Sequence, residues 1–151
     1  PLGLVEDWIV MSPTLAARSK LIAVPADLAD MPCLCNSHFE DDEQWLFLKE
    51  GQSEVVQVRH WVRMNNYPLM RRAALADLGL AKLPAYLVHD DVLAGRLVRV
   101  LADCELPHKP VYLVFPDQRP LPRKVRAVID HFNDWFLDSK GGWQRATSSL
   151  K

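Results

Sequence analysis

The sequence contains no apolar run that approaches the roughly 20 residues of a membrane-spanning helix, and no basic-then-apolar leader at its start. The sequence also lacks an excess of charge of either sign, because 18 Lys and Arg are balanced by 19 Asp and Glu, which gives a formal net charge of -1. A chain without excess positive charge has no long-range attraction for a polyanion. These absences argue against a membrane protein, a secreted precursor and a chain that binds nucleic acid by itself.

Cysteine is scarce, and its odd number makes a disulfide framework a poor interpretation. Cys33, Cys35 and Cys104 are the only cysteines, and a reducing, cytoplasmic setting suits them better. Apolar residues make up 49% and charged residues 25% of the 151 residues, as in ordinary globular proteins of one or two small subdomains. The first residue is Pro1 rather than Met, from which we expect that an upstream segment has been removed.

The N-terminal part of the chain is predicted to hold two short strands with helical turns between them. Residues 8–11 are apolar and β-prone, and Ser12 and Pro13 stop that strand with a capping residue and a residue that cannot donate to a ladder. A short helix is expected from about Thr14, a helical turn over residues 25–29 and a buried strand over residues 33–35.

A hairpin and a helix are predicted in the middle of the chain. Residues 45–49 and 55–62 flank the turn at residues 50–53, and the valines of the second run alternate with period two. Residues 69–78 are rich in helix formers and are followed by Gly79, which we expect to be the left-handed stop of the helix.

The remaining elements continue the alternation of strands and helices. Strands are expected over residues 80–83, 97–101 and 111–115, with helices over residues 86–93, ended by Gly95, and from Pro122 onward, and a frayed tail from Asp138. Alternating strands and helices with one inserted hairpin predict an α/β fold with a mixed sheet.

Several segments together resemble the effector-binding domain of LysR-type transcriptional regulators. The stretch NNYPLMRRAALADLGLAKLPAYLVHDDVLAGRLVRVL, then PVYLVFP and LPRKVRAVIDHF, follows the order and spacing of the C-terminal half of that domain. Upstream, IVMSPTLAAR, PADLADMPCL and QWLFLKEG match the segment between its two subdomains. Asp77 departs from the pattern, because the family often has a small residue there. No segment resembles the family's N-terminal winged helix-turn-helix.

The resemblance implies a fold like that of type II periplasmic binding proteins, with the effector held between two α/β subdomains joined by two crossing strands. The second subdomain would be complete over residues 13–106. The first would be partial: its end and one crossing strand over residues 1–12, and the returning strand and C-terminal helix over residues 107–137. Residues 138–151 would be a flexible tail. The crossing strands would be residues 8–12 and 111–115.

Polar residues that follow predicted strands are the candidate effector contacts. Strand ends in open α/β sheets collect ligands, and the resemblance implies cleft residues in the same loop. The predicted contacts are Asn36, Ser37, His38 and Phe39 in the loop after one strand, Asn65 and Asn66 at a helix start, and Ser12 and Phe115 at the expected crossing strands. A polar loop with one packed aromatic residue would explain the first loop equally well, and plain helix capping would explain the asparagines.

Other clusters have simpler interpretations. Cys33, Cys35 and His38 could bind a metal or sense oxidants, but cysteines on one face of a buried strand behave as small hydrophobes, and zinc would need a fourth ligand. His89, Asp90 and Asp91, the acidic run of residues 40–43 and the basic cluster Arg119, Arg123, Lys124 and Arg126 are most simply solvated surface.

The expected function is therefore the sensing of a small-molecule effector for a LysR-type DNA-binding regulator. No catalytic constellation and no Gly-rich phosphate loop is present, so neither an enzyme nor a cofactor is expected. DNA would be bound only through the missing N-terminal domain, and the full-length protein would be a dimer or tetramer. A stand-alone solute-binding protein of the same fold and a small α/β transferase are the alternatives.

Overall fold

The computed structural model describes residues 2–39, 42–49, 51–115 and 120–137. The chain divides into two compact units. Unit 1 comprises Pro1–Glu6 and His108–Lys151, and unit 2 comprises Asp7–Pro107. The tail expected from Asp138 lies outside the described residues, so the two units are described within those ranges and each by itself.

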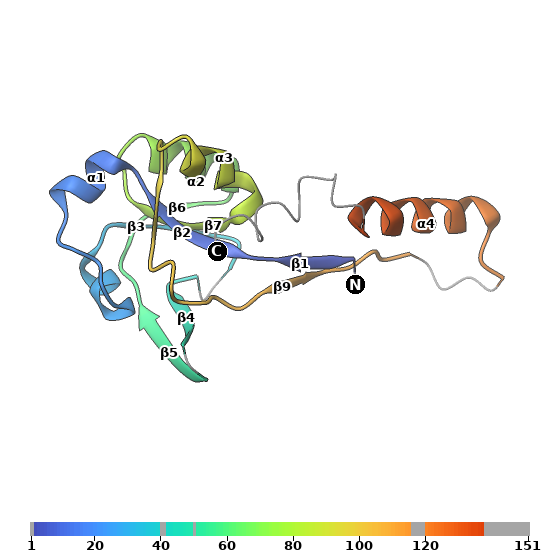
Figure 1. Cartoon of the computed structure of the whole chain (residues 1–151), viewed down its shortest axis with the longest axis horizontal. Coiled ribbons are helices and arrows are strands. Elements are labelled where there is room, and N and C mark those ends of the chain that lie inside the picture. The colour runs from blue at the N-terminus through green and yellow to red at the C-terminus, as the bar shows by residue number, and fades with distance from the viewer. Residues whose placement is uncertain (1, 40–41, 50, 116–119, 138–151) are drawn as a thin grey trace. The chain divides into compact units, whose positions relative to one another are not determined.

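Unit 2 is built on a five-stranded sheet with the order β6-β3-β7-β2-β8 (Figure 1). Its strands are β2 (Asp7–Met11), β3 (Cys33–Asn36), β6 (His60–Met64), β7 (Leu80–Pro84) and β8 (Val98–Val100). Strand β3 is parallel to β6 and β7, whereas β2 is antiparallel to both β7 and β8. The predicted α/β fold with a mixed sheet is confirmed.

The two faces of this sheet are covered by different elements. Helices α2 (Tyr67–Leu75) and α3 (Ala85–Leu93) lie on one face, and the hairpin of β4 (Gln44–Lys49) and β5 (Gln52–Gln57) lies on the other (Figure 1). Strand residues alternate between the faces. Cys33 and Cys35 therefore join a buried cluster with Trp45 and Phe47 of the hairpin, while Trp8 contacts His89 of α3.

The hairpin is shorter than the sequence indicated. The run of residues 55–62 was expected to be one strand, but β5 ends at Gln57 and β6 begins at His60 as an edge strand of the five-stranded sheet. The reason lies in the partner strand, because the ladder ends where Gln44, the first residue of β4, lies opposite Gln57. One further hydrogen bond, from the N–H of Val58 to the carbonyl of Glu43 at 2.8 Å, closes the pairing at this end. The single-strand prediction was wrong.

Gly79 is required for a close approach and not for the left-handed stop that was predicted. Helix α2 ends at Leu75, and Asp77 takes the left-handed conformation with φ of 63°. A Cβ atom on Gly79 would lie 2.6 Å from the carbonyl oxygen of Pro32, which accepts a hydrogen bond from the N–H of Leu80 at 2.9 Å. The prediction for Gly95 is confirmed, since it ends α3 with φ of 68°.

The segment between β2 and β3 contains two short helical elements. Helix α1 covers Pro13–Arg18 and the 3-10 helix η1 covers Pro25–Asp30, as the proline and capping residues indicated. No helix among the described residues is long and apolar enough to cross a membrane.

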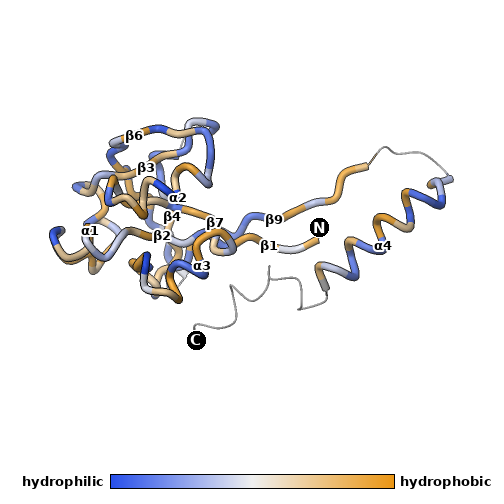
Figure 2. The backbone as a smooth tube through the Cα atoms, turned by 90° about the horizontal axis from the view of Figure 1, so that it is seen from above, coloured by the Kyte–Doolittle hydropathy of each residue, from blue (hydrophilic) through white to orange (hydrophobic). Residues whose placement is uncertain are grey.

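Unit 1 pairs β1 (Gly3–Val5) with β9 (Lys109–Val111) in antiparallel register and contains α4 (Arg123–Leu137). A strand was expected over residues 111–115, but only Val111 belongs to one. Strand β1 has three residues, so it offers partners only to residues 109–111. Apolar and polar residues alternate along α4 (Figure 2).

Candidate functional site

The carboxyl ends of the parallel strands β3 and β6 bring two predicted polar segments together. Asn36, the last residue of β3, is in register with Met64, the last residue of β6. The N–H of Ser37 continues the pairing by donating to the carbonyl of Met64 at 2.9 Å. The turn that follows β3 and the asparagines that follow β6 therefore lie at the same edge of the sheet. We call Asn36–Phe39 the site turn.

The site turn is held by the side chain and backbone of Asn36. The Asn36 side chain is 3% exposed, and its Oδ1 accepts a hydrogen bond from the N–H of His38 at 3.0 Å. Its carbonyl accepts from the N–H of Phe39 at 3.3 Å. Asn36 thus shapes the turn from inside, whereas Ser37, His38 and Phe39 are exposed, Phe39 by 50%.

The two asparagines at the start of α2 differ in role. Asn66 is the N-cap, and its Oδ1 accepts a hydrogen bond from the N–H of Leu69 at 3.0 Å. Asn65 precedes the cap and is exposed. Both asparagines are exposed, and the capping explanation considered from the sequence applies to Asn66.

Ser12 lies at the opposite edge of the sheet from the site turn. Strand β2 runs antiparallel to β7, with Trp8 opposite Leu83 and Val10 opposite Ala81, so its carboxyl end lies where β7 begins. Ser12 is 2% exposed, and its Oγ caps α1 by accepting from the N–H of Leu15 at 3.0 Å. The structure thus separates Ser12 from Asn36 and Asn65. Phe115 belongs to unit 1 and is 45% exposed.

Asp42 and Glu43 were expected to be solvated, which is wrong for Asp42, whereas Glu43 is partly exposed and forms ion pairs at the surface. Asp42 is 8% exposed, accepts a hydrogen bond from the N–H of Asn36 and pairs with Lys82 Nζ at 3.2 Å. Glu43 Oε1 contacts His60 Nδ1 at 2.8 Å and Arg63 at 3.0 Å. A signal was available: a lysine in the middle of an otherwise apolar strand, β7, needs a buried partner. Residues 40–41 lie outside the described residues.

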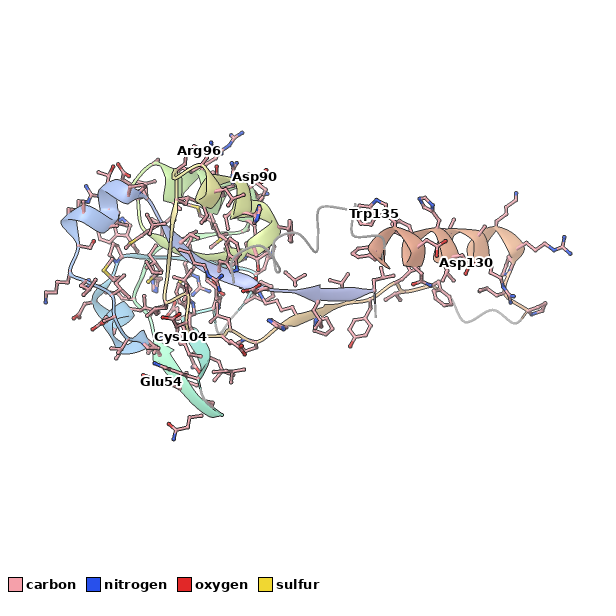
Figure 3. All side chains as sticks on the ribbon, viewed as in Figure 1. Glu54, Asp90, Arg96, Cys104, Asp130 and Trp135 are labelled. Atoms are coloured by element: carbon pink, nitrogen blue, oxygen red, sulfur yellow. The ribbon has the colours of Figure 1, made fainter. Side chains whose placement is uncertain are left out.

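Asp91 is fully buried, so the surface interpretation of His89, Asp90 and Asp91 is wrong for Asp91. Arg71 of α2 contacts its carboxylate at 2.5 and 2.9 Å, and Arg96 Nε contacts it at 2.8 Å. Burial raises the pKa of Asp91, but the hydrogen bonds and charges of the two arginines outweigh it, so the pKa falls below its usual value. Asp90, a residue of α3, is solvated, and Arg96 follows the end of that helix (Figure 3). The cluster joins α2 to α3 and is not a catalytic site.

Cys33 and Cys35 are free, buried thiols. Burial raises the pKa of Cys33 to about 12 and that of Cys35 to about 11, so both are protonated at neutral pH. The interpretation of these residues as small hydrophobes is confirmed by their place in the core. In the part of the chain that the structure describes, no three His, Cys, Asp or Glu residues are grouped to hold a metal ion.

A mixed α/β sheet with polar turns gathered at the carboxyl edge of its parallel strands is the arrangement in which α/β domains commonly bind small ligands. Comparison with known families agrees. The chain belongs to the LysR substrate binding domain family, which matches residues 1–137.

Relatives with curated names are transcription regulators. The chain is 30% identical over 125 residues to the HTH-type transcriptional regulator PtxR of Pseudomonas aeruginosa, covering 83% of this chain and 40% of PtxR. It is 29% identical over 114 residues to the HTH-type transcriptional activator AaeR of Escherichia coli, covering 76% of this chain and 37% of AaeR. The chain thus spans about two fifths of these regulators. They are not enzymes, in agreement with the expected absence of catalysis.

Solved structures of the same family share the fold. The regulatory domain of AphB in Vibrio vulnificus is 26% identical with a TM-score of 0.71, and the match covers 87% of this chain and 66% of that one. The regulatory domain of CrgA from Neisseria meningitidis, at 18% identity and a TM-score of 0.71, covers 88% of this chain and 65% of that one.

Proposed function

We propose that this domain binds a small-molecule effector for a longer LysR-type transcription regulator, and that the effector contacts Ser37, His38, Phe39 and Asn65. The register of Asn36 with Met64 supports this function most strongly, because it brings two polar segments far apart in sequence to one sheet edge. Asn36 shapes the site turn and Asn66 caps α2, so both hold the contact residues in place and do not themselves contact the effector. We leave Ser12 out of the proposed contacts because it follows the carboxyl end of β2, at the sheet edge opposite the site turn.

The exposed groups favour an effector that combines a polar or anionic group with an apolar part. Asn65 stands beside the N-terminus of α2, where the positive end of the helix dipole favours an anionic group such as a carboxylate. Phe39, half exposed, offers apolar surface at the same edge. A small organic acid satisfies both demands.

Within the regulator, effector binding would act by population shift. A ligand changes a conformational equilibrium only by as much as its affinities for the two states differ. We propose that unit 2 is the second effector subdomain, that unit 1 is part of the first, and that β1 and β9 are the strands that join them. A segment of the regulator outside this chain would bind DNA. The regulator would act in the cytoplasm as a homo-oligomer.

Thermal unfolding of this chain with a panel of small carboxylic acids and their primary amides tests the binding function. A compound that binds only the folded state raises the melting temperature by an amount that grows with its concentration relative to its dissociation constant. We expect acids to raise it more than their amides, and Ser37→Ala to reduce the rise. No compound with a measurable effect, or an equal effect of acids and amides, would contradict the proposed chemistry.

A further inference from the structure

Asp42 is the point at which the site turn is fastened to the core of unit 2. Its carboxylate accepts a hydrogen bond from the N–H of Asn36 and pairs with Lys82 Nζ at 3.2 Å. Its carbonyl accepts from the indole Nε1 of Trp45 at 2.7 Å, and its own N–H donates to the carbonyl of Phe39 at 3.4 Å. One buried residue thus contacts both ends of the site turn.

Lys82 fixes the Asp42 carboxylate through an ion pair. It lies in the middle of β7, its side chain is 16% exposed, and its ammonium sits 5.1 Å from the ring centroid of Trp45. An ammonium in this position is stabilised by the carboxylate and by the negative face of the indole ring. The sequence of contacts therefore runs from the site turn through Asp42 to a strand and to the hairpin.

We propose that Asp42 is a positioning residue for effector binding and that the ion pair with Lys82 fixes it. We also propose that the indole N–H of Trp45, which donates to the Asp42 carbonyl, responds to the position of Asp42 and so has a sensing role. This inference rests on the proposed effector site, because it concerns the geometry of the turn that carries Ser37 and Phe39. Asp42 touches no effector itself; it fixes the backbone of Asn36, from which the exposed residues follow.

A second attachment of the turn is weaker. Arg63 donates to the carbonyl of Phe39 at 3.3 Å and pairs with Glu43 at 3.0 Å, but the side chains of Arg63 and Glu43 are 35% and 24% exposed. Partly exposed ion pairs are screened by water and contribute little. The buried pair of Asp42 and Lys82 therefore determines the position of the turn, and Glu43→Gln is a control that leaves it in place.

The test compares two double variants, Asp42→Asn with Lys82→Met and Asp42→Leu with Lys82→Met. Both lack the ion pair and neither leaves an unpaired buried charge. Asparagine keeps an oxygen that can accept from the N–H of Asn36, whereas leucine does not. The two proteins differ in the proposed positioning contact, and a loss of folding would affect amides throughout unit 2.

Amide hydrogen exchange by NMR reads the result without any ligand. We expect exchange at Asn36, His38 and Phe39 to be about tenfold faster in the leucine variant than in the asparagine variant, with equal rates in β2. Equal rates at the site turn, or faster exchange throughout unit 2 in the leucine variant alone, would overturn the positioning role.

A second readout uses an acid from the panel that binds the wild-type chain. Its binding should move the indole N–H signal of Trp45 in the wild type and in Glu43→Gln, and its affinity should fall by about tenfold in the leucine variant relative to the asparagine variant. If no acid binds, the proposed function fails while the exchange comparison still decides the role of Asp42. Binding with an unmoved Trp45 signal would remove its sensing role.

Discussion

Asn36 and Met64 are register partners on the parallel strands β3 and β6, and both are the last residues of their strands. The polar residues that directly follow the two strands therefore lie at the same edge of the sheet. The pairing explains how Ser37 and Asn65, 28 positions apart in the sequence, can face one small ligand.

Ser37→Ala and Asn65→Ala should weaken effector binding without unfolding the domain. Each removes one polar contact worth about 0.5–1.5 kcal/mol, or roughly 2- to 13-fold in dissociation constant. Titration calorimetry with an acid that binds the wild type measures the change. Ser12→Ala is the matched control at the opposite edge, where loss of the α1 cap costs about 1 kcal/mol of stability and leaves affinity unchanged. Equal affinity in all three variants would exclude the site turn.

Asp91→Asn should destabilise unit 2 at neutral pH by about 1–3 kcal/mol, because two charge-assisted hydrogen-bond sets to Arg71 and Arg96 are weakened. The native pKa of Asp91 lies below its usual value of 3.8, so the stabilisation is present above that pH and is lost as the pH falls through the native pKa. Urea unfolding at pH 7 and at pH 3 measures this. A difference between variant and wild type that grows on acidification would contradict the assignment.

Gly79→Ala should cost about 1–3 kcal/mol, since its new Cβ would meet the backbone carbonyl of Pro32, which the Leu80 N–H holds in place. Gly51→Ala serves for comparison. No atom lies within 4 Å of a Cβ at Gly51, and only its φ of 78° opposes the change, at about 1 kcal/mol. Thermal unfolding should therefore show the larger loss at Gly79, and the reverse order would argue against the close approach.

The exposed apolar residues of α4 should make the chain associate. Val128, Phe132 and Trp135 are 52%, 39% and 45% exposed on this helix, and exposed apolar surface of this kind drives association. Sedimentation velocity over a range of concentrations should show self-association that Phe132→Asp reduces. Leu21→Asp, at an 85% exposed position of unit 2, should leave it unchanged. A wild-type monomer at all concentrations would contradict this expectation.

Local patterns in the sequence were sufficient for most elements but not for their partners. Proline and capping residues located α1, η1 and α2, and Gly95 marked the end of α3, because these signals act within a few residues. The division of the run 55–62 between β5 and β6 depended on where β4 begins. The need for glycine at position 79 depended on the backbone of Pro32, 47 positions away. Such long-range contacts leave no local signal.

The candidate site shows the same limit. The two polar segments could be predicted to share an edge because parallel strands end together. Ser12 was placed with them wrongly in space, because the antiparallel direction of β2 cannot be read from its composition. Asp42 and Asp91 were taken for solvated residues, because Lys82 and Arg71, which pair with them, come from other elements, β7 and α2.

The central claim is that the effector binds at the edge formed by the site turn and Asn65, and an NMR titration tests it most directly. The isotopically labelled chain is titrated with the acid that raises its melting temperature most, and the amide signals are followed residue by residue. We expect the largest shifts at Ser37, His38, Phe39 and Asn65, with the start of α1 unaffected. Largest shifts at Ser12 and Leu15, with the site turn unmoved, would contradict the account.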